Sequence, residues 1–225
     1  MGFDVKPKFV TFDMNGTLIK FSINDTMREV LGDRLPAEVA DEYLRICKAY
    51  RIDECTGAYQ PFHQVVARSM ERASRYVGLE YREDEARAVY ERIPTWGPYP
   101  GVTEALNRLA EEVPLVIITN SDTAHAVRLA ENLKAPFEVV ISAEEMGVYK
   151  PRLRAFEYTF DKLGVTPDEI VHVSASPMYD HRPAAIMGIN KVYMDRGWEH
   201  DEHWLGYERI TDIADLPVLF GLPRP

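Results

Sequence analysis

From Pro100 onward, short runs of apolar residues alternate with segments in which apolar residues recur every three or four positions. The short runs predict buried β-strands, whereas the wider spacing predicts amphipathic helices. Apolar strands separated by helices are typical of a parallel sheet that helices cover on both faces. We therefore predict an α/β fold with a doubly wound, mostly parallel sheet. The expected strands are 9–12, 114–120, 137–142, 169–176 and 190–194, and the expected helices are 101–113, 123–133, 151–164 and 182–188.

The segment between residues 19 and 97 has a different pattern, because strand-like runs are replaced by charged stretches with helical spacing. Helices are expected over 36–51, 61–78 and 83–93, followed by a turn-rich stretch, "PTWGPYPG", at 94–101. We interpret this segment as a helical cap domain inserted after the first strand. The predicted core domain is then 1–18 with 98–225, and the cap is 19–97. The tail from Gly206 predicts a last strand and a short helix.

Composition narrows the possible partners and the compartment. The 225 residues carry a net charge of -10, with lysine and arginine scattered along the chain, which argues against nucleic acid as a partner. The two cysteines, Cys47 and Cys55, lack ligand-like neighbours, so neither zinc nor a disulfide framework is expected. The first residues lack the apolar core of a signal peptide, and no later stretch has the length and apolarity to span a bilayer. We expect a cytoplasmic protein with no membrane partner.

Polar side chains follow the predicted strands at the points where the strands end. Asp13 follows "FVTF", Lys150 follows the run beginning "FEVVIS", and Asp180 follows "IVHVSASPMY". The run "LVII" is followed by Thr119, Asn120 and Ser121. The carboxyl ends of parallel strands meet at one edge of a sheet, where ligands bind in open α/β folds. Each residue alone has an ordinary structural explanation, such as a helix cap or a solvated lysine. Together they predict two carboxylates and one ammonium facing a common crevice.

That combination allows a specific chemistry. A carboxylate can attack an electrophilic carbon or phosphorus and form a covalent ester. A nearby lysine keeps the carboxylate ionised, and the turn "NGTL" offers backbone N–H groups together with the Thr17 hydroxyl. The second carboxylate, Asp180, can either orient a hydrolytic water or ligate a cation.

These segments resemble the motifs of the haloacid dehalogenase superfamily. "FDMNGTL" is similar to its first motif, with Asp13 as the nucleophile, "VIITNSD" to the second, "YKP" with Lys150 to the third, and "VHVSASPMYD" to the fourth. Phosphatases of the superfamily carry an acidic residue where this chain has Asn15, because an alkoxide leaving group needs a proton. A halide leaves without one. The resemblance therefore favours the L-2-haloacid dehalogenases, although these usually have tyrosine at that place.

The resemblance implies hydrolysis of short 2-haloalkanoic acids to 2-hydroxy acids through an ester on Asp13, with no metal or organic cofactor. Thr17 and Lys150 would position Asp13, Asp180 would orient water, and Arg45, in "LRICKAYR", would receive the halide. A small-molecule substrate is the expected partner, and relatives suggest a possible homodimer. The residues expected to contact the substrate are Asn15, Phe62, Thr119, Asn120, Phe156, Ser174, Ser176 and Tyr179.

Two alternatives remain open at this point. One is a Mg²⁺-dependent phosphate-ester or phosphonate hydrolase, in which Asp13 and Asp180 would hold the metal and His181 would supply the acid. The other is a non-catalytic relative that uses the crevice or the cap for binding.

Overall fold

The computed structural model describes residues 6–225, and this part of the chain folds into two compact units. One unit contains the chain up to Lys20 together with Gly97–Pro225, and the other is Phe21–Trp96. We call them the core and the cap. The chain passes from the core to the cap after Lys20 and returns after Trp96. Both positions lie within two residues of the boundaries, 18/19 and 97/98, that the change of hydrophobic pattern predicted.

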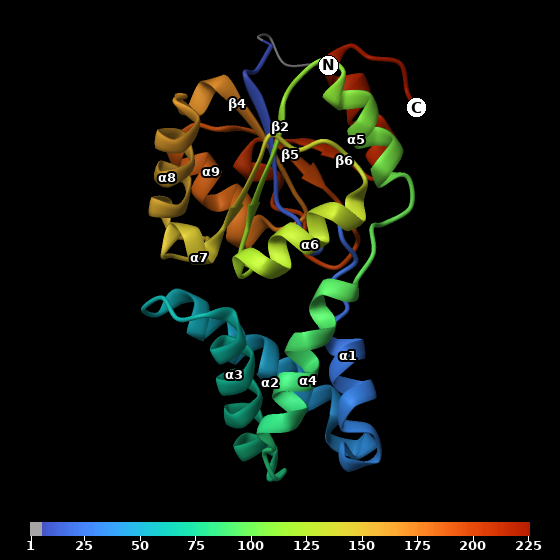
Figure 1. The fold of residues 1–225 in the computed structure, drawn as a ribbon, viewed down its shortest axis with the longest axis vertical. Coiled ribbons are helices and arrows are strands. Elements are labelled where there is room, and N and C mark those ends of the chain that lie inside the picture. The colour runs from blue at the N-terminus through green and yellow to red at the C-terminus, as the bar shows by residue number, and fades with distance from the viewer. Residues whose placement is uncertain (1–5) are drawn as a thin grey trace. The chain divides into compact units, whose positions relative to one another are not determined.

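The core is built on one parallel sheet, which has six strands within the described residues, in the order β3-β2-β1-β4-β5-β6 (Figure 1). The first strand, β1, lies in the middle and pairs with β2 and β4. Val10 and Phe12 point to one face and Thr11 to the other, and all three are fully buried, as expected for a strand covered on both faces. The strands are β1 (Phe9–Phe12), β2 (Leu115–Thr119), β3 (Val139–Ser142), β4 (Ile170–Ser174), β5 (Asn190–Met194) and β6 (Glu208–Ile210).

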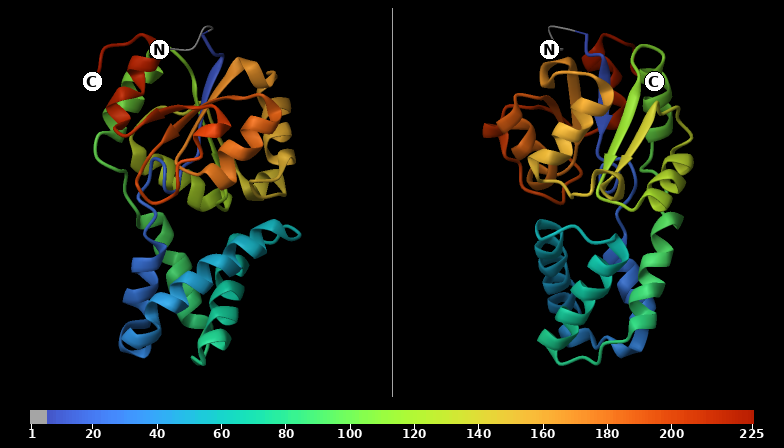
Figure 2. Two further views of the ribbon diagram at one scale, coloured as in Figure 1. Left: turned by 180° about the vertical axis from the view of Figure 1, so that it is seen from behind. Right: turned by 60° about the vertical axis from the view of Figure 1, so that its left-hand side comes forward.

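Helices cover both faces of this sheet, which confirms the doubly wound α/β prediction (Figures 1 and 2). α5 (Val102–Ala110) and α6 (Thr123–Leu133) lie on one face, and α8 (Leu153–Leu163) and α9 (Arg182–Met187) lie on the other. The chain changes faces after β3 and the short α7 (Ala143–Met146), because β4 lies on the far side of β1. The order of strands therefore reverses at β1, which makes the end of β1 the expected ligand position.

The cap consists of helices in its described residues: α1 (Ile23–Leu31), α2 (Ala37–Thr56), α3 (Phe62–Val77) and α4 (Glu83–Arg92). α2 and α3 pack against each other, and α4 packs on α3 and α1. Tyr43 of α2 and Val65 of α3 are completely buried, so the apolar stripes seen in the sequence form the interior of this unit.

Several elements differ from the sequence-based predictions. α1, α7 and a π-helical turn over Pro177–His181 were not predicted, because short segments carry too few apolar repeats to show a period. Pro151 does not open α8, which begins at Leu153 after a cis Lys150–Pro151 peptide. The tail after β6 forms two short 3₁₀ turns, at Ile213–Asp215 and Pro217–Phe220, in place of the expected helix.

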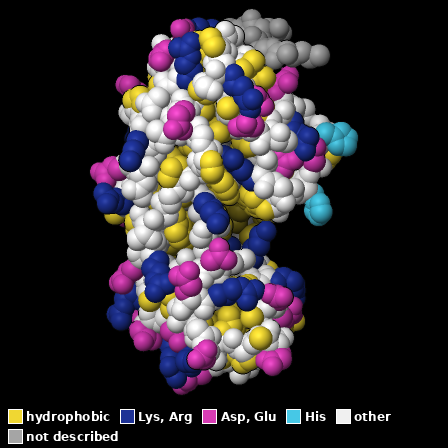
Figure 3. All heavy atoms as spheres, turned by 90° about the vertical axis from the view of Figure 1, so that its right-hand side faces the viewer, with side chains coloured by type: hydrophobic (Ala, Val, Ile, Leu, Met, Phe, Trp, Pro, Cys, Tyr) yellow, Lys and Arg dark blue, Asp and Glu magenta, His cyan; other side chains and the backbone are white. Residues whose placement is uncertain are grey.

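The surface carries both signs of charge. On the face drawn in Figure 3, basic and acidic side chains are interspersed, and none of the basic groups there merge into a stripe. No helix within residues 6–225 combines the length and apolarity needed to cross a membrane.

The packing of α6 leads to a stability prediction. Leu129 is fully buried, whereas Val127 in the same helix is 46 % exposed. We expect Leu129→Ala to lower the free energy of unfolding by about 2–5 kcal/mol, because it removes buried methyl groups and leaves a cavity. Val127→Ala should change it by less than about 0.5 kcal/mol. Urea denaturation followed by circular dichroism measures both, and equal effects would contradict the packing described for α6.

Candidate active site

Asp13 lies directly after β1, at the carboxyl edge of the sheet. Phe12 pairs in register with Ile117 of β2 and Val173 of β4, so Asp13 lies just past the end of β1, between the last residues of its two neighbouring strands. Its backbone N–H continues the pattern of the sheet by donating to the Val173 carbonyl at 3.0 Å. The side chain is 12 % exposed. The central strand thus places a largely buried carboxylate at the carboxyl edge of the sheet.

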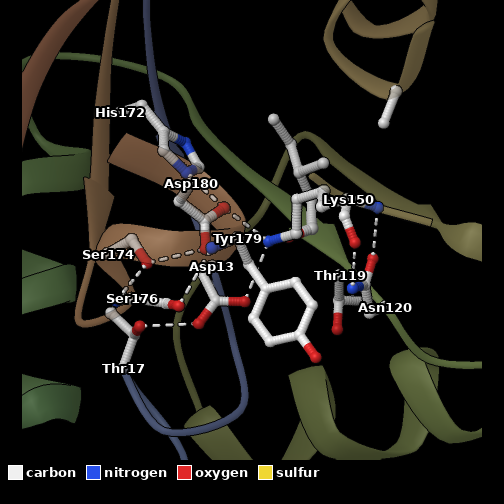
Figure 4. Close-up of polar contacts among 12 residues, drawn as sticks. Asp13, Thr17, Thr119, Asn120, Lys150, His172, Ser174, Ser176, Tyr179 and Asp180 are labelled. Atoms are coloured by element: carbon white, nitrogen blue, oxygen red, sulfur yellow. Dashed lines mark hydrogen bonds and ion pairs between the residues drawn. The ribbon is translucent and has the colours of Figure 1, made fainter. Parts of the chain in front are cut away.

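The turn after Asp13 brings a hydroxyl back to the carboxylate. Gly16 has φ +93°, and a Cβ atom there would lie 2.8 Å from the Trp198 ring, so only glycine fits this position. The turn places Thr17 Oγ1 2.7 Å from Asp13 Oδ2, to which it donates (Figure 4). Thr17 Oγ1 in turn accepts a hydrogen bond from the Ala175 N–H. The hydroxyl is therefore held from both sides.

Lys150 lies between the two predicted carboxylates. Its Nζ donates to Asp13 Oδ1 at 2.9 Å, to Asp180 Oδ1 at 2.7 Å and to the Ile118 carbonyl at 2.9 Å. These bonds use all three ammonium protons of a side chain that is 1 % exposed. Asn120 fixes the backbone of the same residue, because it accepts from the Lys150 N–H and donates to the Lys150 carbonyl.

Asp180 is the more enclosed of the two carboxylates. It belongs to the π-helical turn after β4 and is fully buried. Its Oδ1 accepts from Lys150 and lies 2.9 Å from His172 Nε2, while its Oδ2 accepts from the Ser174 hydroxyl at 2.9 Å (Figure 4). A carboxylate offers about four acceptor sites, so one remains on Oδ2.

The environment gives the two carboxyl groups opposite pKa shifts. Burial raises the pKa of Asp13 above its usual value, against the lowering effect of Lys150. Burial acts on Asp180 in the same sense, but the charge of Lys150 and the hydrogen bond from His172 outweigh it and hold the pKa of Asp180 below its usual range. Burial would lower the pKa of Lys150, yet the two carboxylates raise it. On acidification, Asp13 therefore takes up a proton before Asp180.

Asn15 is tied to the end of β2. Its Nδ2 donates to Ser121 Oγ at 3.0 Å, and Ser121 Oγ lies 3.2 Å from Thr119 Oγ1. The structure therefore brings Asn15 and Thr119 together through Ser121. The amide of Asn15 cannot act as the proton donor that an acidic residue provides at this place.

The remaining residues predicted to contact a substrate lie in different surroundings, and their contacts with a substrate stay predictions. Phe156 is fully buried in a core cluster, with its ring edge-on to His172 at 5.6 Å. Ser174 bonds Asp180, and Ser176 Oγ accepts from the Tyr179 N–H within the π-helical turn. Phe62 is a buried residue at the start of α3 in the cap.

Two arginines of α2 have contrasting environments within the cap. Arg45 is exposed and forms two hydrogen bonds with the carboxylate of Glu42. Arg51 is 7 % exposed, lies over the Phe21 ring at 5.4 Å, and has an Nη1 atom without a hydrogen-bond partner among the described residues. The predicted role of Arg45 stays a prediction, but Arg51 has the less satisfied charge.

Sequence reasoning missed several residues around the site. His172 is a polar residue inside the apolar run of β4, and that interruption is the signal that could have identified it. Arg196 follows β5 and donates from Nε and Nη2 to the Thr17 carbonyl, at 3.1 and 2.7 Å. No local pattern indicates this last contact, because the two residues are far apart in the sequence.

The site offers few free oxygen atoms that could act as ligands of a cation. Mg²⁺ requires about six oxygen ligands in octahedral geometry. Here the Oδ1 atoms of Asp13 and Asp180 share the Lys150 ammonium, and Asp13 Oδ2 accepts from Thr17. No cluster of three or more histidine, cysteine or acidic side chains suited to a metal occurs within residues 6–225. These side chains fit an ammonium between two carboxylates better than a divalent metal.

A capped, doubly wound α/β core with carboxylates around a buried lysine defines a recognised class of hydrolases. The model of the haloacid dehalogenase-like hydrolase family matches residues 7–188. The chain belongs to this family, and it is a hydrolase. It is 26% identical over 168 residues to (S)-2-haloacid dehalogenase 1 of Pseudomonas sp. (strain CBS-3), covering 72% of this chain and 74% of that one. It is also 30% identical over 225 residues to a phosphoglycolate phosphatase of Chromobacterium violaceum, covering 93% and 94%.

Solved structures confirm the fold. The L-2-haloacid dehalogenase of Xanthobacter autotrophicus superimposes with a TM-score of 0.78 at 21% identity, covering 96% of this chain and 98% of that one. A HAD-hydrolase of Bacillus subtilis bound to magnesium superimposes with a TM-score of 0.82 at 17% identity, covering 96% and 100%. Dehalogenases and a magnesium-bound hydrolase thus share this architecture.

The bridge made by Lys150 leads to a pH-dependent stability prediction. Lys150→Met leaves two buried carboxylates without their ammonium, which should cost about 3–5 kcal/mol of unfolding free energy at neutral pH. Without the ammonium, burial raises both folded-state pKa values above the unfolded value of about 4. Such groups stabilise the fold below the unfolded pKa and lose that contribution as the pH rises through the folded pKa. The deficit should therefore be full at neutral pH and shrink on acidification.

Lys191→Met is the matched control for this experiment. Lys191 is also buried, but its Nζ donates to the Ile189 carbonyl and, within residues 6–225, forms no ion pair with a carboxylate. We expect this variant to be neutral or slightly more stable, with no comparable dependence on pH. Urea titrations of both variants across pH measure the difference. A Lys150→Met deficit that stays constant down to acidic pH would contradict the bridge.

Proposed function

We propose that the protein hydrolyses the carbon–halogen bond of short 2-haloalkanoic acids and releases 2-hydroxy acids. The observation that carries this proposal is the pairing of a braced carboxylate nucleophile, Asp13, with an amide, Asn15, at the place where a leaving alkoxide would need an acid. A halide leaves as a weak base and needs no proton. The 2-haloacid dehalogenases among the relatives support the same reaction.

In the first step, a carboxylate oxygen of Asp13 attacks C2 of the substrate on the side opposite the halogen. The new bond is the ester C–O bond, and the carbon–halogen bond breaks with its electron pair leaving on the halide. The configuration at C2 is inverted by this single displacement. Thr17 and Lys150 hold the attacking carboxylate at a fixed angle, so that little rotational freedom is lost on reaching the transition state.

In the second step, water adds to the Cγ carbonyl carbon of the Asp13 ester, and the bond between Cγ and the alkoxy oxygen breaks. The alkoxy oxygen takes one proton derived from water, and the other leaves to solvent as the Asp13 carboxylate is restored. Asp180 has a depressed pKa, so it is a weak base. We propose that it orients the water by accepting a hydrogen bond, without being the final proton acceptor.

The substrate carboxylate is assigned to the end of β2. Thr119 and Asn120 are the residues proposed to hold it, with Ser121 next to them. Asn120 already bonds the Lys150 backbone with both ends of its amide, which leaves one amide proton for a ligand. This arrangement would couple substrate binding to the position of the lysine.

A phosphate-ester hydrolase is the second candidate, favoured by the 30% identical phosphoglycolate phosphatase. It needs an acid for the leaving group, and His181 is the residue considered for this role. His181 is fully buried, its Nε2 bonds the Ser174 carbonyl, and burial lowers its pKa to about 4. It is therefore neutral at pH 7 and a poor proton donor, which weakens this candidate.

The reaction is tested by halide release from L-2-chloropropionate and bromoacetate, with and without EDTA. We expect release that EDTA does not reduce and that is lost in Asp13→Ala, because the displacement needs the carboxylate and no metal. A parallel assay follows phosphate release from phosphoglycolate and a generic phosphate ester with Mg²⁺. Mg²⁺-dependent phosphate release without halide release would replace the proposal by a phosphatase function. If the protein shows neither activity, a non-catalytic binding role is favoured.

A second test concerns the cap arginine that would receive the halide. The resemblance assigns this role to Arg45, and we compare it with Arg51, the buried arginine of the same helix, whose Nη1 has no hydrogen-bond partner among the described residues. We expect Arg51→Met to lower kcat at least about tenfold, because an unneutralised guanidinium stabilises developing negative charge. Arg45→Met, whose charge Glu42 already offsets, should change kcat by less than about twofold.

Arg51→Lys keeps a positive charge and should recover part of the lost rate. Thermal unfolding of each variant separates a loss of charge from a loss of the folded cap. A large loss in Arg45→Met with little change in Arg51→Met would restore the role predicted from the resemblance.

A further inference from the structure

His172 occupies an unusual place for an ionisable side chain. It lies in the middle of β4, pairs in register with Thr11 of β1 and Lys191 of β5, and is fully buried. Its ring bonds Asp180 through Nε2, at 2.9 Å from Oδ1, and contacts Thr11 through Nδ1, at 2.8 Å from Oγ1. Both ring nitrogens therefore have a polar partner, one of which is a residue of the candidate site.

The proton on Nε2 follows from its partner. Asp180 accepts from Lys150 and Ser174 and keeps its charge to a pH below the usual range, so its oxygens are acceptors only. A hydrogen bond between Nε2 and Asp180 Oδ1 thus requires that Nε2 carries the proton. The imidazole is a charge-assisted donor to the carboxylate.

The Thr11 hydroxyl determines the state of the other nitrogen. Its two possible acceptors are His172 Nδ1 at 2.8 Å and the Val171 carbonyl at 3.5 Å. The shorter contact is the stronger hydrogen bond. In the neutral ring that carries its proton on Nε2, facing Asp180, Nδ1 accepts from Thr11, and this is the tautomer that the first experiment below tests.

We propose that Thr11 and His172 are positioning residues that fix Asp180 for hydrolysis of the ester on Asp13. The proposal rests on the function proposed above and assigns these two residues to its second step. His172 holds Oδ1 and Ser174 holds Oδ2, so these two donors together fix the plane of the carboxylate. The one free acceptor site, on Oδ2, then keeps a constant direction for water.

Asp180 needs a donor other than Lys150, because the two carboxylates share the Lys150 ammonium. Lys150 contacts both Asp13 and Asp180 in the free enzyme. When Asp13 becomes a neutral ester, its attraction for Lys150 weakens and the ammonium is free to move toward Asp180. His172 does not contact Asp13 in any bond found among the described residues, so its hold on Asp180 is the same before and after the first step.

The first experiment examines the ring itself in the wild-type protein. Long-range ¹H–¹⁵N correlation spectra distinguish protonated from unprotonated histidine nitrogens, with His172→Gln used to assign the signal. We expect a protonated Nε2 and an unprotonated Nδ1. A proton on Nδ1 with a bare Nε2 would overturn the proposal, because that ring cannot donate to Asp180.

The second experiment separates the two chemical steps. His172→Phe removes the donor but keeps a ring, so halide should be released normally in the first turnover while ester hydrolysis slows by about 10- to 100-fold. Because halide release precedes hydrolysis, kcat and KM should fall together and kcat/KM should stay unchanged. Mass spectrometry of quenched enzyme should show the 1-carboxyethyl ester on Asp13. His172→Gln, whose amide can still donate, should recover part of kcat.

Thr11 provides a second, milder perturbation. Thr11→Val is nearly isosteric and removes the hydrogen bond to Nδ1, so it should decrease kcat less than His172→Phe does. Thr11→Ser keeps the hydroxyl and should keep kcat close to the wild-type value. Thr159→Val is the matched control, because Thr159 is equally buried and its hydroxyl bonds only the Ala155 carbonyl among the described residues. It should leave kcat and KM unchanged.

The outcomes distinguish the two proposals. If wild-type protein releases no halide, the proposed function fails and the hydrolytic role of His172 fails with it. If wild-type protein is active but folded His172→Phe shows no ester, or loses kcat/KM in proportion to kcat, the positioning role alone is overturned. Thermal unfolding of every variant identifies any that do not fold. If His172→Phe does not fold, the Thr11 variants test the positioning role in its place.

Discussion

The structure of the site depends on one ammonium group placed between two buried carboxylates. Asp13, Asp180 and Lys150 together carry one uncompensated negative charge in a region that is almost fully buried. Burying these charges is costly unless each is paired and hydrogen bonded. The surrounding donors meet that requirement: Thr17 for Asp13, and His172 with Ser174 for Asp180. Removing any one of these side chains would leave a buried charge less satisfied.

The parallel sheet makes this concentration of charge possible. β1 lies between β2 and β4, so the residues that follow the three strands meet at one edge. The backbone also contributes, since the Ile118 carbonyl takes the third proton of Lys150, and the Ala175 N–H holds the Thr17 hydroxyl. Rigid strand ends hold such groups more precisely than mobile loops do. The same geometry gives the two carboxyl groups opposite pKa shifts, which distinguishes the proposed nucleophile, Asp13, from Asp180, which stays charged to lower pH.

The sequence revealed the fold and the central charges because both produce local patterns. Strand and helix periods gave the doubly wound sheet, and polar residues at strand ends identified Asp13, Lys150 and Asp180. Residues that act through distant contacts left weaker signals. Arg196 reaches the Thr17 carbonyl from the loop after β5, and nothing in either segment indicates the pairing. The contrast between Arg45 and Arg51 depends on burial within a helix bundle, which periodicity placed only approximately.

The charge of the site changes during the proposed reaction, and the hydrogen bonds suit that change. Before attack, Lys150 is divided between two carboxylates, which leaves Asp13 partly uncompensated and able to act as a nucleophile. Once the ester forms, Lys150 and Asp180 are a neutral pair, and the departing halide carries the charge away. A site that is negatively charged at rest and neutral in the intermediate favours loss of an anion, because the product state no longer has an unpaired buried charge. The same site would bind a phosphate dianion poorly without a metal to offset the repulsion. The balance of one lysine against two carboxylates therefore agrees with the proposed loss of a halide ion, while Asn15 remains the residue that separates this proposal from a phosphatase.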